Sequence, residues 1–160
     1  IAYQSAKMGC FSIGVDYSVT AMKFAKKLLN KNTLFENPFK LILSDARNLP
    51  FPSKQFDVIF MLDIVEHLSQ KDLLEVLQQT HDCLAPKGRL IIHTMPNKNY
   101  YTWGYPIYRF IMQLIGNKLP KDPKDRYYHG ECHVNIQTPK SLKNNLMRQD
   151  GGFIYFYLSL

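Results

Sequence analysis

Short apolar runs alternate with amphipathic stretches along most of the chain. Four runs are continuous in apolar character and lie at residues 11–15, 40–44, 56–62 and 89–95, and a fifth, aromatic run covers 153–159. Apolar runs without polar alternation are typical of strands buried on both faces, as in a parallel sheet covered by helices. The pattern therefore predicts five strands in a mostly parallel sheet.

The stretches between these runs carry helix signals. Ser18 can cap a helix over Val19–Asn30, and Ser69 with Asp72 resembles a capping box that opens a helix over 70–84. Thr138 and the proline after it open a last helix, which runs to residue 149. Strands that alternate with helices indicate βαβ units with right-handed crossovers. We expect an α/β, doubly wound, Rossmann-like fold with helices on both faces.

Residues 96–135 interrupt this alternation inside what is otherwise one domain over 1–160. The interruption contains six aromatic residues between positions 100 and 110, and a helix-like run over 107–115 that is apolar nearly all round. An insert of this length is usually a lid or a binding loop. We interpret 96–135 as a lid that roofs an apolar acceptor, while docking on a partner subunit or packing on the core remain alternatives.

Composition and charge limit the kinds of partner that the chain is expected to bind. Hydrophobic residues make up 46% of the chain and charged residues 21%, as in ordinary globular domains. The net charge of +7 is concentrated in residues 91–160, with 9 Lys and Arg against 4 Asp and Glu. No basic run or stacking motif accompanies it, so we favour a solvated basic face and expect no nucleic-acid partner. Contact of residues 100–119 with a membrane surface is the alternative. Three scattered cysteines favour reduced thiols and a cytoplasmic location.

Polar side chains follow the predicted strands at the points where ligands bind in doubly wound sheets. Asp16 ends the first run, and its carboxylate can accept hydrogen bonds from both hydroxyls of a ribose. Asp45 follows the second run and can accept from the exocyclic amine of an adenine, while the next backbone N–H meets a ring nitrogen. Asp16 alone would also suit a domain that binds NAD.

The order of five motifs, GVDYS, DARNLPF, FDVIFMLDIVEHL, LAPKGRLIIHTMPN and HVNIQTPKSL, resembles the class I S-adenosylmethionine-dependent methyltransferases. The resemblance is to the small-molecule type (methyltransferase type 11-like), including the ubiquinone-pathway O-methyltransferases. It covers residues 9–98 closely and 133–152 loosely, and it implies methyl transfer to a small, apolar or aromatic acceptor. The cofactor-binding residues that it implies are Asp16 and Tyr17 for the ribose, Asp45 and Ala46 for the adenine, and Asp63, Ile64 and Val65 for the methionine end.

The resemblance also bears on catalytic and metal-binding residues. A hydroxyl nucleophile needs a general base, and His67 is the best placed candidate, with His133 near the acceptor. In some relatives an acid-x-x-Glu-His run binds a divalent ion here. Asp63, Glu66 and His67 are a sparse ligand set for Mg²⁺, so we favour a structural role for Glu66 and His67 and predict no metal site.

The chain departs from the family pattern at its ends. Nothing before Asp16 supplies a glycine-rich loop, and the strand before that loop and the last strand of the pattern have no counterparts. We therefore expect a partial domain, inactive by itself, from a longer protein. A non-catalytic scaffold and, less favoured, an NAD-dependent Rossmann enzyme are the rival interpretations. The acceptor and the oligomeric state are left open.

Overall fold

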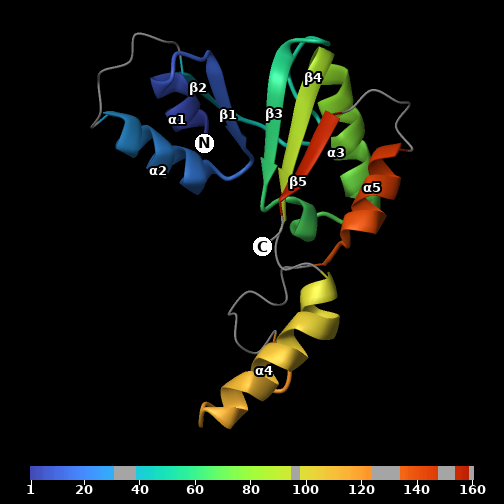
Figure 1. The fold of residues 1–160 in the computed structure, drawn as a ribbon. Helices are drawn as coiled ribbons and strands as arrows, with labels where there is room; N and C mark the ends of the chain where they lie inside the picture. Colours follow the sequence, from blue (N-terminus) through green and yellow to red (C-terminus); the bar gives the residue numbers. More distant parts are fainter. Residues whose placement is uncertain (31–38, 95–97, 124–133, 148–153, 159–160) are drawn as a thin grey trace. The chain divides into compact units, whose positions relative to one another are not determined.

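The computed structural model describes residues 1–30, 39–94, 98–123, 134–147 and 154–158. The chain divides into two compact units, Ile1–Pro50 and Phe51–Leu160, and each is described by itself (Figure 1). Within the described residues, no helix combines the length and the apolar character that crossing a membrane requires.

The first unit is built on one pair of parallel strands. β1 (Ser12–Asp16) pairs with β2 (Phe39–Leu43) in a register that runs from Ser12 opposite Phe39 to Asp16 opposite Leu43. Two helices, α1 (Ala2–Lys7) and α2 (Val19–Asn30), pack against the pair. As predicted, the Ser18 hydroxyl caps α2, accepting from the Ala21 N–H at 3.2 Å. The parallel pairing brings the ends of both strands to one edge.

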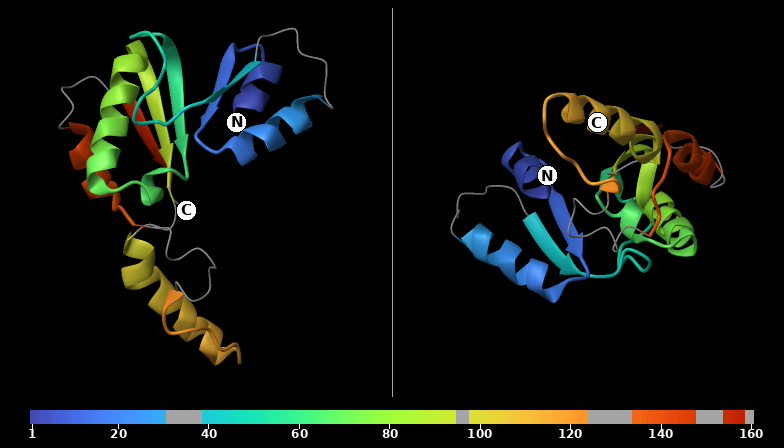
Figure 2. Two further views of the ribbon diagram at one scale, coloured as in Figure 1. Left: turned by 180° about the vertical axis from the view of Figure 1, so that it is seen from behind. Right: turned by 90° about the horizontal axis from the view of Figure 1, so that it is seen from below.

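The second unit contains a three-stranded parallel sheet. β3 (Phe56–Leu62), β4 (Leu84–His93) and β5 (Ile154–Leu158) lie in the order β3-β4-β5. Both α3 (Gln70–Cys83) and α5 (Pro139–Met147) lie on the same side of this sheet (Figure 2). The side chains that form its core are Leu73, Val76, Leu77, Leu90, Ile92, Leu142 and Leu146.

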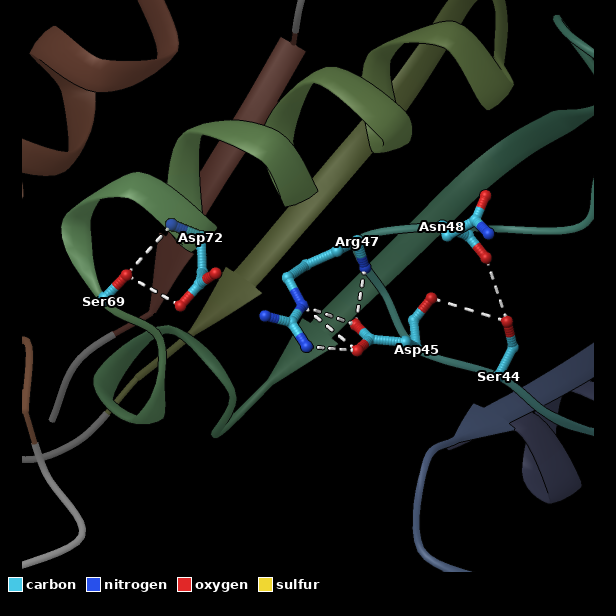
Figure 3. A network of polar contacts seen from close by, with 6 residues as sticks. All are labelled: Ser44, Asp45, Arg47, Asn48, Ser69 and Asp72. Atoms are coloured by element: carbon cyan, nitrogen blue, oxygen red, sulfur yellow. Dashed lines mark hydrogen bonds and ion pairs between the residues drawn. The ribbon is translucent and has the colours of Figure 1, made fainter.

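The start of α3 follows the predicted capping signal. The Ser69 hydroxyl accepts from the Asp72 N–H at 3.1 Å and donates to the Asp72 carboxylate at 2.7 Å (Figure 3). In the usual capping box, the acidic side chain accepts a hydrogen bond from the backbone N–H of the capping residue. Here the acidic side chain accepts from the side chain of the capping residue instead. The cap fixes where α3 begins, immediately after the segment that leaves β3.

The first part of β4 differs from the prediction. The strand begins at Leu84, directly after α3, instead of at residue 89, and its pairing with β3 shifts register between Phe56 and Val58. The shift spans residues 85–88, which include Pro86 and Gly88. A Cβ on Gly88 would lie 2.8 Å from the Ala85 carbonyl oxygen, so only glycine fits this close approach.

We predicted that the strands formed by the apolar runs are buried on both faces. β3 is buried on one face only. Met61 is buried on the side of α3, whereas Val58, Phe60 and Leu62 are about 40% exposed. The physical reason is that α3 and α5 both cover the other side of this sheet (Figure 2).

The predicted lid contains a helix that begins earlier than expected. A π-helical turn, η2 (Tyr100–Gly104), leads into α4 (Tyr105–Leu114). Tyr105 is buried, and its hydroxyl donates to the Pro120 carbonyl at 2.8 Å, which holds the segment after α4 against the helix. The remainder of the predicted lid, 96–97 and 124–133, lies outside the described residues.

The strands form the parallel sheets and crossover helices that the fold prediction required. The described strands form two separate sheets, one of β1 and β2 and one of β3, β4 and β5. Within the second sheet, β5 pairs directly with β4.

Replacing the cap of α3 tests this local account. Ser69→Ala removes the acceptor of the Asp72 N–H and should lower the free energy of unfolding by about 0.5–2 kcal/mol. Ser69→Asn, which keeps a capping oxygen, should retain most of the stability. Urea denaturation of the two variants beside the parent protein measures both, and an equal loss in both would contradict the capping role.

Candidate functional site

Asp16 lies at the carboxyl end of β1, where its side chain is held by the chain that follows. One carboxylate oxygen accepts from the Ser18 N–H at 2.8 Å, and the Asp16 carbonyl accepts from the Ser44 N–H at 3.0 Å. The second bond ties the end of β1 to the end of β2. Since a carboxylate has about four lone-pair sites, Asp16 keeps capacity for further donors. Tyr17, beside it, is 81% exposed.

Asp45 follows β2 and is engaged by a neighbour that the sequence prediction did not include. Arg47 donates from Nε to both carboxylate oxygens at 3.1 Å, from Nη2 at 2.6 Å and from its backbone N–H at 2.9 Å (Figure 3). The side-chain bonds from Arg47, followed by its backbone bond, hold the pKa of Asp45 below its ordinary value. The Asp-x-Arg spacing is the signal that could have revealed this pair.

A tight turn positions both Asp45 and Ala46. The Asn48 N–H donates to the Asp45 carbonyl at 3.0 Å, and the Ser44 hydroxyl donates to the Asn48 carbonyl at 3.0 Å (Figure 3). Ala46 lies within this turn and is half-buried. The end of β2 thus presents an ordered backbone next to a carboxylate, which is the arrangement expected for holding an adenine.

In the second unit, Asp63 leaves β3 in a left-handed conformation, with φ of 51°. Its N–H donates to the His93 carbonyl at 2.9 Å, and its carboxylate lies 2.7 Å from His93 Nδ1. A carboxylate at Nδ1 favours the tautomer with its proton there, which leaves Nε2 as an acceptor. His93, which the sequence prediction did not include, forms a carboxylate–imidazole pair with Asp63 at the end of β4. Sequence distance hid the pair, since 30 residues separate its members.

The turn after Asp63 is η1 (Val65–His67), and two of its side chains are buried. Glu66 is 1% exposed, and its carboxylate accepts from the Thr94 hydroxyl at 2.7 Å. The Glu66 carbonyl accepts from the Asn135 N–H at 3.1 Å, which attaches the last residue of the predicted lid to this turn. These contacts support the structural role that was favoured for Glu66.

The remaining predicted site residues of the second unit differ in how far they are exposed to solvent. Val65 is fully buried, with none of the residue exposed, and Ile64 is half-buried. His67 is exposed, and its N–H donates to the Ile64 carbonyl at 3.0 Å. His133 lies outside the described residues.

Metal binding was weighed for the Asp63, Glu66 and His67 group. In the part of the chain that the structure describes, no three His, Cys, Asp or Glu side chains are arranged to hold a metal ion. The Glu66 carboxylate is committed to Thr94, which agrees with its structural role.

Comparison with known proteins shows the family to which this chain belongs. A family model described as "Methyltransferase domain" matches residues 1–92. A ubiquinone biosynthesis O-methyltransferase from Bartonella tribocorum is 27% identical over 143 residues, which cover 89% of this chain and 52% of that protein. A demethylmenaquinone methyltransferase from Chlamydia muridarum is 26% identical, with 79% and 53% covered. The chain spans about half the length of the curated relatives it matches.

Solved structures agree on the fold. A SAM-dependent methyltransferase from Methanosarcina mazei superimposes with a TM-score of 0.66 at 17% identity, covering 93% of this chain and 73% of that one. One from Archaeoglobus fulgidus gives 0.61 at 23% identity, covering 92% and 54%. The family model, together with the relatives and the shared fold, identifies a class I methyltransferase domain. The chain belongs to the methyltransferase domain family, as its sequence predicted.

The Arg47 fork leads to a pH-dependent prediction. The pKa of Asp45 is lower in the folded protein than its ordinary value. The ion pair of Asp45 with Arg47 therefore stabilises the fold at any pH above the ordinary pKa of an aspartate. This stabilisation is lost as the pH falls through the pKa of Asp45 in the folded protein. Arg47→Ala should raise the pKa of Asp45 toward its ordinary value, and Arg47→Lys should raise it less. Carboxyl-carbon NMR titration measures both, and an unchanged pKa in Arg47→Ala would contradict the assignment.

Proposed function

We propose that the protein containing this chain transfers a methyl group from S-adenosylmethionine to a small, apolar or aromatic acceptor. The observation that carries the proposal is the carboxyl edge of β1 and β2, where Asp16 and Asp45 lie on ordered turns in a chain of the methyltransferase family. Doubly wound folds bind their nucleotides at such an edge.

The residues of the first unit suit the nucleoside part of the cofactor. Asp16, with Tyr17 beside it, would accept from the ribose hydroxyls. Asp45 and the backbone at Ala46 would hold the adenine, and the Arg47 fork would keep Asp45 ionised as an acceptor. Asp63, Ile64 and Val65 would flank the methionine end, and Val65, which is fully buried, would anchor the turn that follows Asp63 and Ile64.

The bound cofactor supplies an electrophilic methyl group on a sulfonium, so the task of the protein is mainly alignment of nucleophile and methyl group. An acceptor hydroxyl must also lose a proton. His67 is exposed at the turn after β3, and His93 is oriented by Asp63 at 2.7 Å with Nε2 as its acceptor atom. Either imidazole could take the proton. The His93 pair adds a candidate to His67 and His133.

An apolar acceptor is supported by the names of the relatives and by the predicted lid. The two relatives described above are named for ubiquinone biosynthesis and for demethylmenaquinone methylation. Beside η2 lies an open pocket of about 810 Å³. Its lining residues are Lys98, Tyr101, Thr102, Lys121, Asp122, Pro123 and Ile136. The lining combines an aromatic ring and aliphatic groups with two lysines and one aspartate, which suits an aromatic acceptor that also carries polar groups.

A second candidate is a non-catalytic scaffold that keeps the methyltransferase fold. The observation in its favour is that Arg47 already occupies both carboxylate oxygens of Asp45. A binding role would then belong to the surface of the fold, and cofactor would not be held at the edge of β1 and β2.

Cofactor binding separates the two candidates. Asp16→Ala removes a charged acceptor of the ribose and should weaken the binding of S-adenosylhomocysteine by roughly 1.5–3 kcal/mol, the value of a hydrogen bond to a charged group. Calorimetric titration of the full-length protein measures the change. Asp57→Ala, which removes an exposed carboxylate from β3, is the matched control and should leave binding unchanged. Absence of binding in the folded parent protein would favour the scaffold.

The two histidines can be told apart by kinetics. His67→Ala should lower turnover with cofactor affinity nearly intact if His67 is the general base, and His93→Ala should do so if the Asp63–His93 pair supplies it. General-base catalysis typically contributes about 10²–10⁴-fold in rate. Turnover against pH and calorimetric affinity are measured for each variant. A variant that loses affinity as much as turnover has no base role, and two variants with full turnover would exclude both histidines.

A further inference from the structure

We propose that α4 carries a docking surface for an anionic lipid membrane. The surface consists of five large apolar side chains on η2 and α4, which we call the apolar face: Trp103, Ile107, Phe110, Ile111 and Leu114. Each is more than half exposed, from 51% for Ile111 to 71% for Trp103 and Leu114. Exposed apolar side chains that are contiguous, instead of scattered, mark interaction sites.

The spacing of these residues places them on one side of the helix. In α4 the steps from Ile107 to Phe110, Ile111 and Leu114 are three, four and seven residues. At about 100° per residue, these four side chains fall within an arc of roughly 100°. Trp103 is four residues before Ile107 and extends the same side onto η2. The result is an amphipathic helix with a continuous apolar side.

The opposite side of α4 is already covered by the protein's own chain. Tyr105 is 1% exposed, and its hydroxyl donates to the Pro120 carbonyl at 2.8 Å. Arg109 Nε donates to the Leu119 carbonyl at 3.3 Å. The segment after α4 therefore runs back along one side of the helix, and these contacts hold the other side, with its apolar residues, toward the outside.

The charges near the apolar face indicate which kind of partner binds to it. From Lys98 to Lys121, the segment that contains η2 and α4, the sequence has four Lys and Arg residues and no Asp or Glu. Lys98 and Lys118, which are exposed, lie in the segments that flank the helix. Positive charge beside an apolar helix face is complementary to an anionic lipid surface. A second copy of this chain would bring the same positive charge and be repelled.

The length of α4 determines how it can meet a bilayer. Ten residues at about 1.5 Å each give a helix of roughly 15 Å, half the roughly 30 Å of a hydrocarbon core. The helix is therefore suited to lie in the plane of the interface, with its apolar face among the acyl chains and its cations at the headgroups. Docking uses none of the residues assigned to the cofactor and does not depend on the proposed function.

Trp103 is the chain's only tryptophan and serves as a reporter. Vesicles of phosphatidylcholine, with or without phosphatidylglycerol, are added to the full-length protein, and Trp103→Phe supplies the background emission. Tryptophan emission should shift to the blue on the anionic vesicles, and the protein should sediment with them. Binding to the neutral vesicles should be weaker by roughly tenfold or more, because each basic residue near an anionic surface adds to the attraction.

Paired substitutions identify the surface. Phe110→Ser with Ile111→Ser should abolish sedimentation with anionic vesicles, whereas Phe24→Ser should not, although Phe24 on α2 is 64% exposed and Phe110 61%. Lys98→Gln with Lys118→Gln should weaken binding several-fold. The matched pair Lys23→Gln with Lys26→Gln, which removes the same charge from α2, should weaken it less. Circular dichroism checks that each variant is folded.

Three results would overturn the proposal. The first is no blue shift and no sedimentation with anionic vesicles. The second is binding that the Phe110 and Ile111 substitutions leave intact. The third is a parent protein that self-associates, becomes monomeric on the same substitutions and ignores vesicles, which would assign the apolar face to a second copy. None of these results depends on whether the protein binds S-adenosylhomocysteine, so the proposed function is tested separately.

Discussion

Parallel pairing of strands is the constraint on which the site depends. A parallel pair brings the carboxyl ends of both strands to the same edge, so residues far apart in sequence become neighbours there. The pairing of β1 with β2 joins the end at Asp16 to the turn at Asp45, through the bond from the Ser44 N–H. The pairing of β3 with β4 places Asp63 against His93. Each pair of strands thereby generates its own cluster of polar groups.

The carboxylates that follow these strands differ in the groups with which they form hydrogen bonds. We infer that each carboxylate has a different role. Glu66 is buried and bonded to a buried threonine, so it stabilises the turn. Asp45 is held by a guanidinium, which keeps the pKa of its carboxyl below the ordinary value. Asp63 orients an imidazole. Asp16 uses one oxygen for a backbone N–H and keeps capacity for a ligand.

Local signals predicted the elements well, because they depend on neighbours in sequence. The Ser69 cap, the strand at Phe56–Leu62 and the helix after Ser18 were all predicted from the sequence and are confirmed. The start of β4 and the His93 partner could not be predicted in this way. The first depends on a register shift against β3, and the second on a contact across 30 residues. Arg47 was within reach, two residues from Asp45, but composition alone does not show that its fork closes on that carboxylate.

The most direct test of the central claim is a crystal structure of the full-length protein with S-adenosylhomocysteine. The account predicts that the ribose hydroxyls bond to Asp16 and that the adenine lies on the turn at Asp45 and Ala46. A ligand bound elsewhere, or an edge of β1 and β2 left empty at saturating ligand, would contradict it.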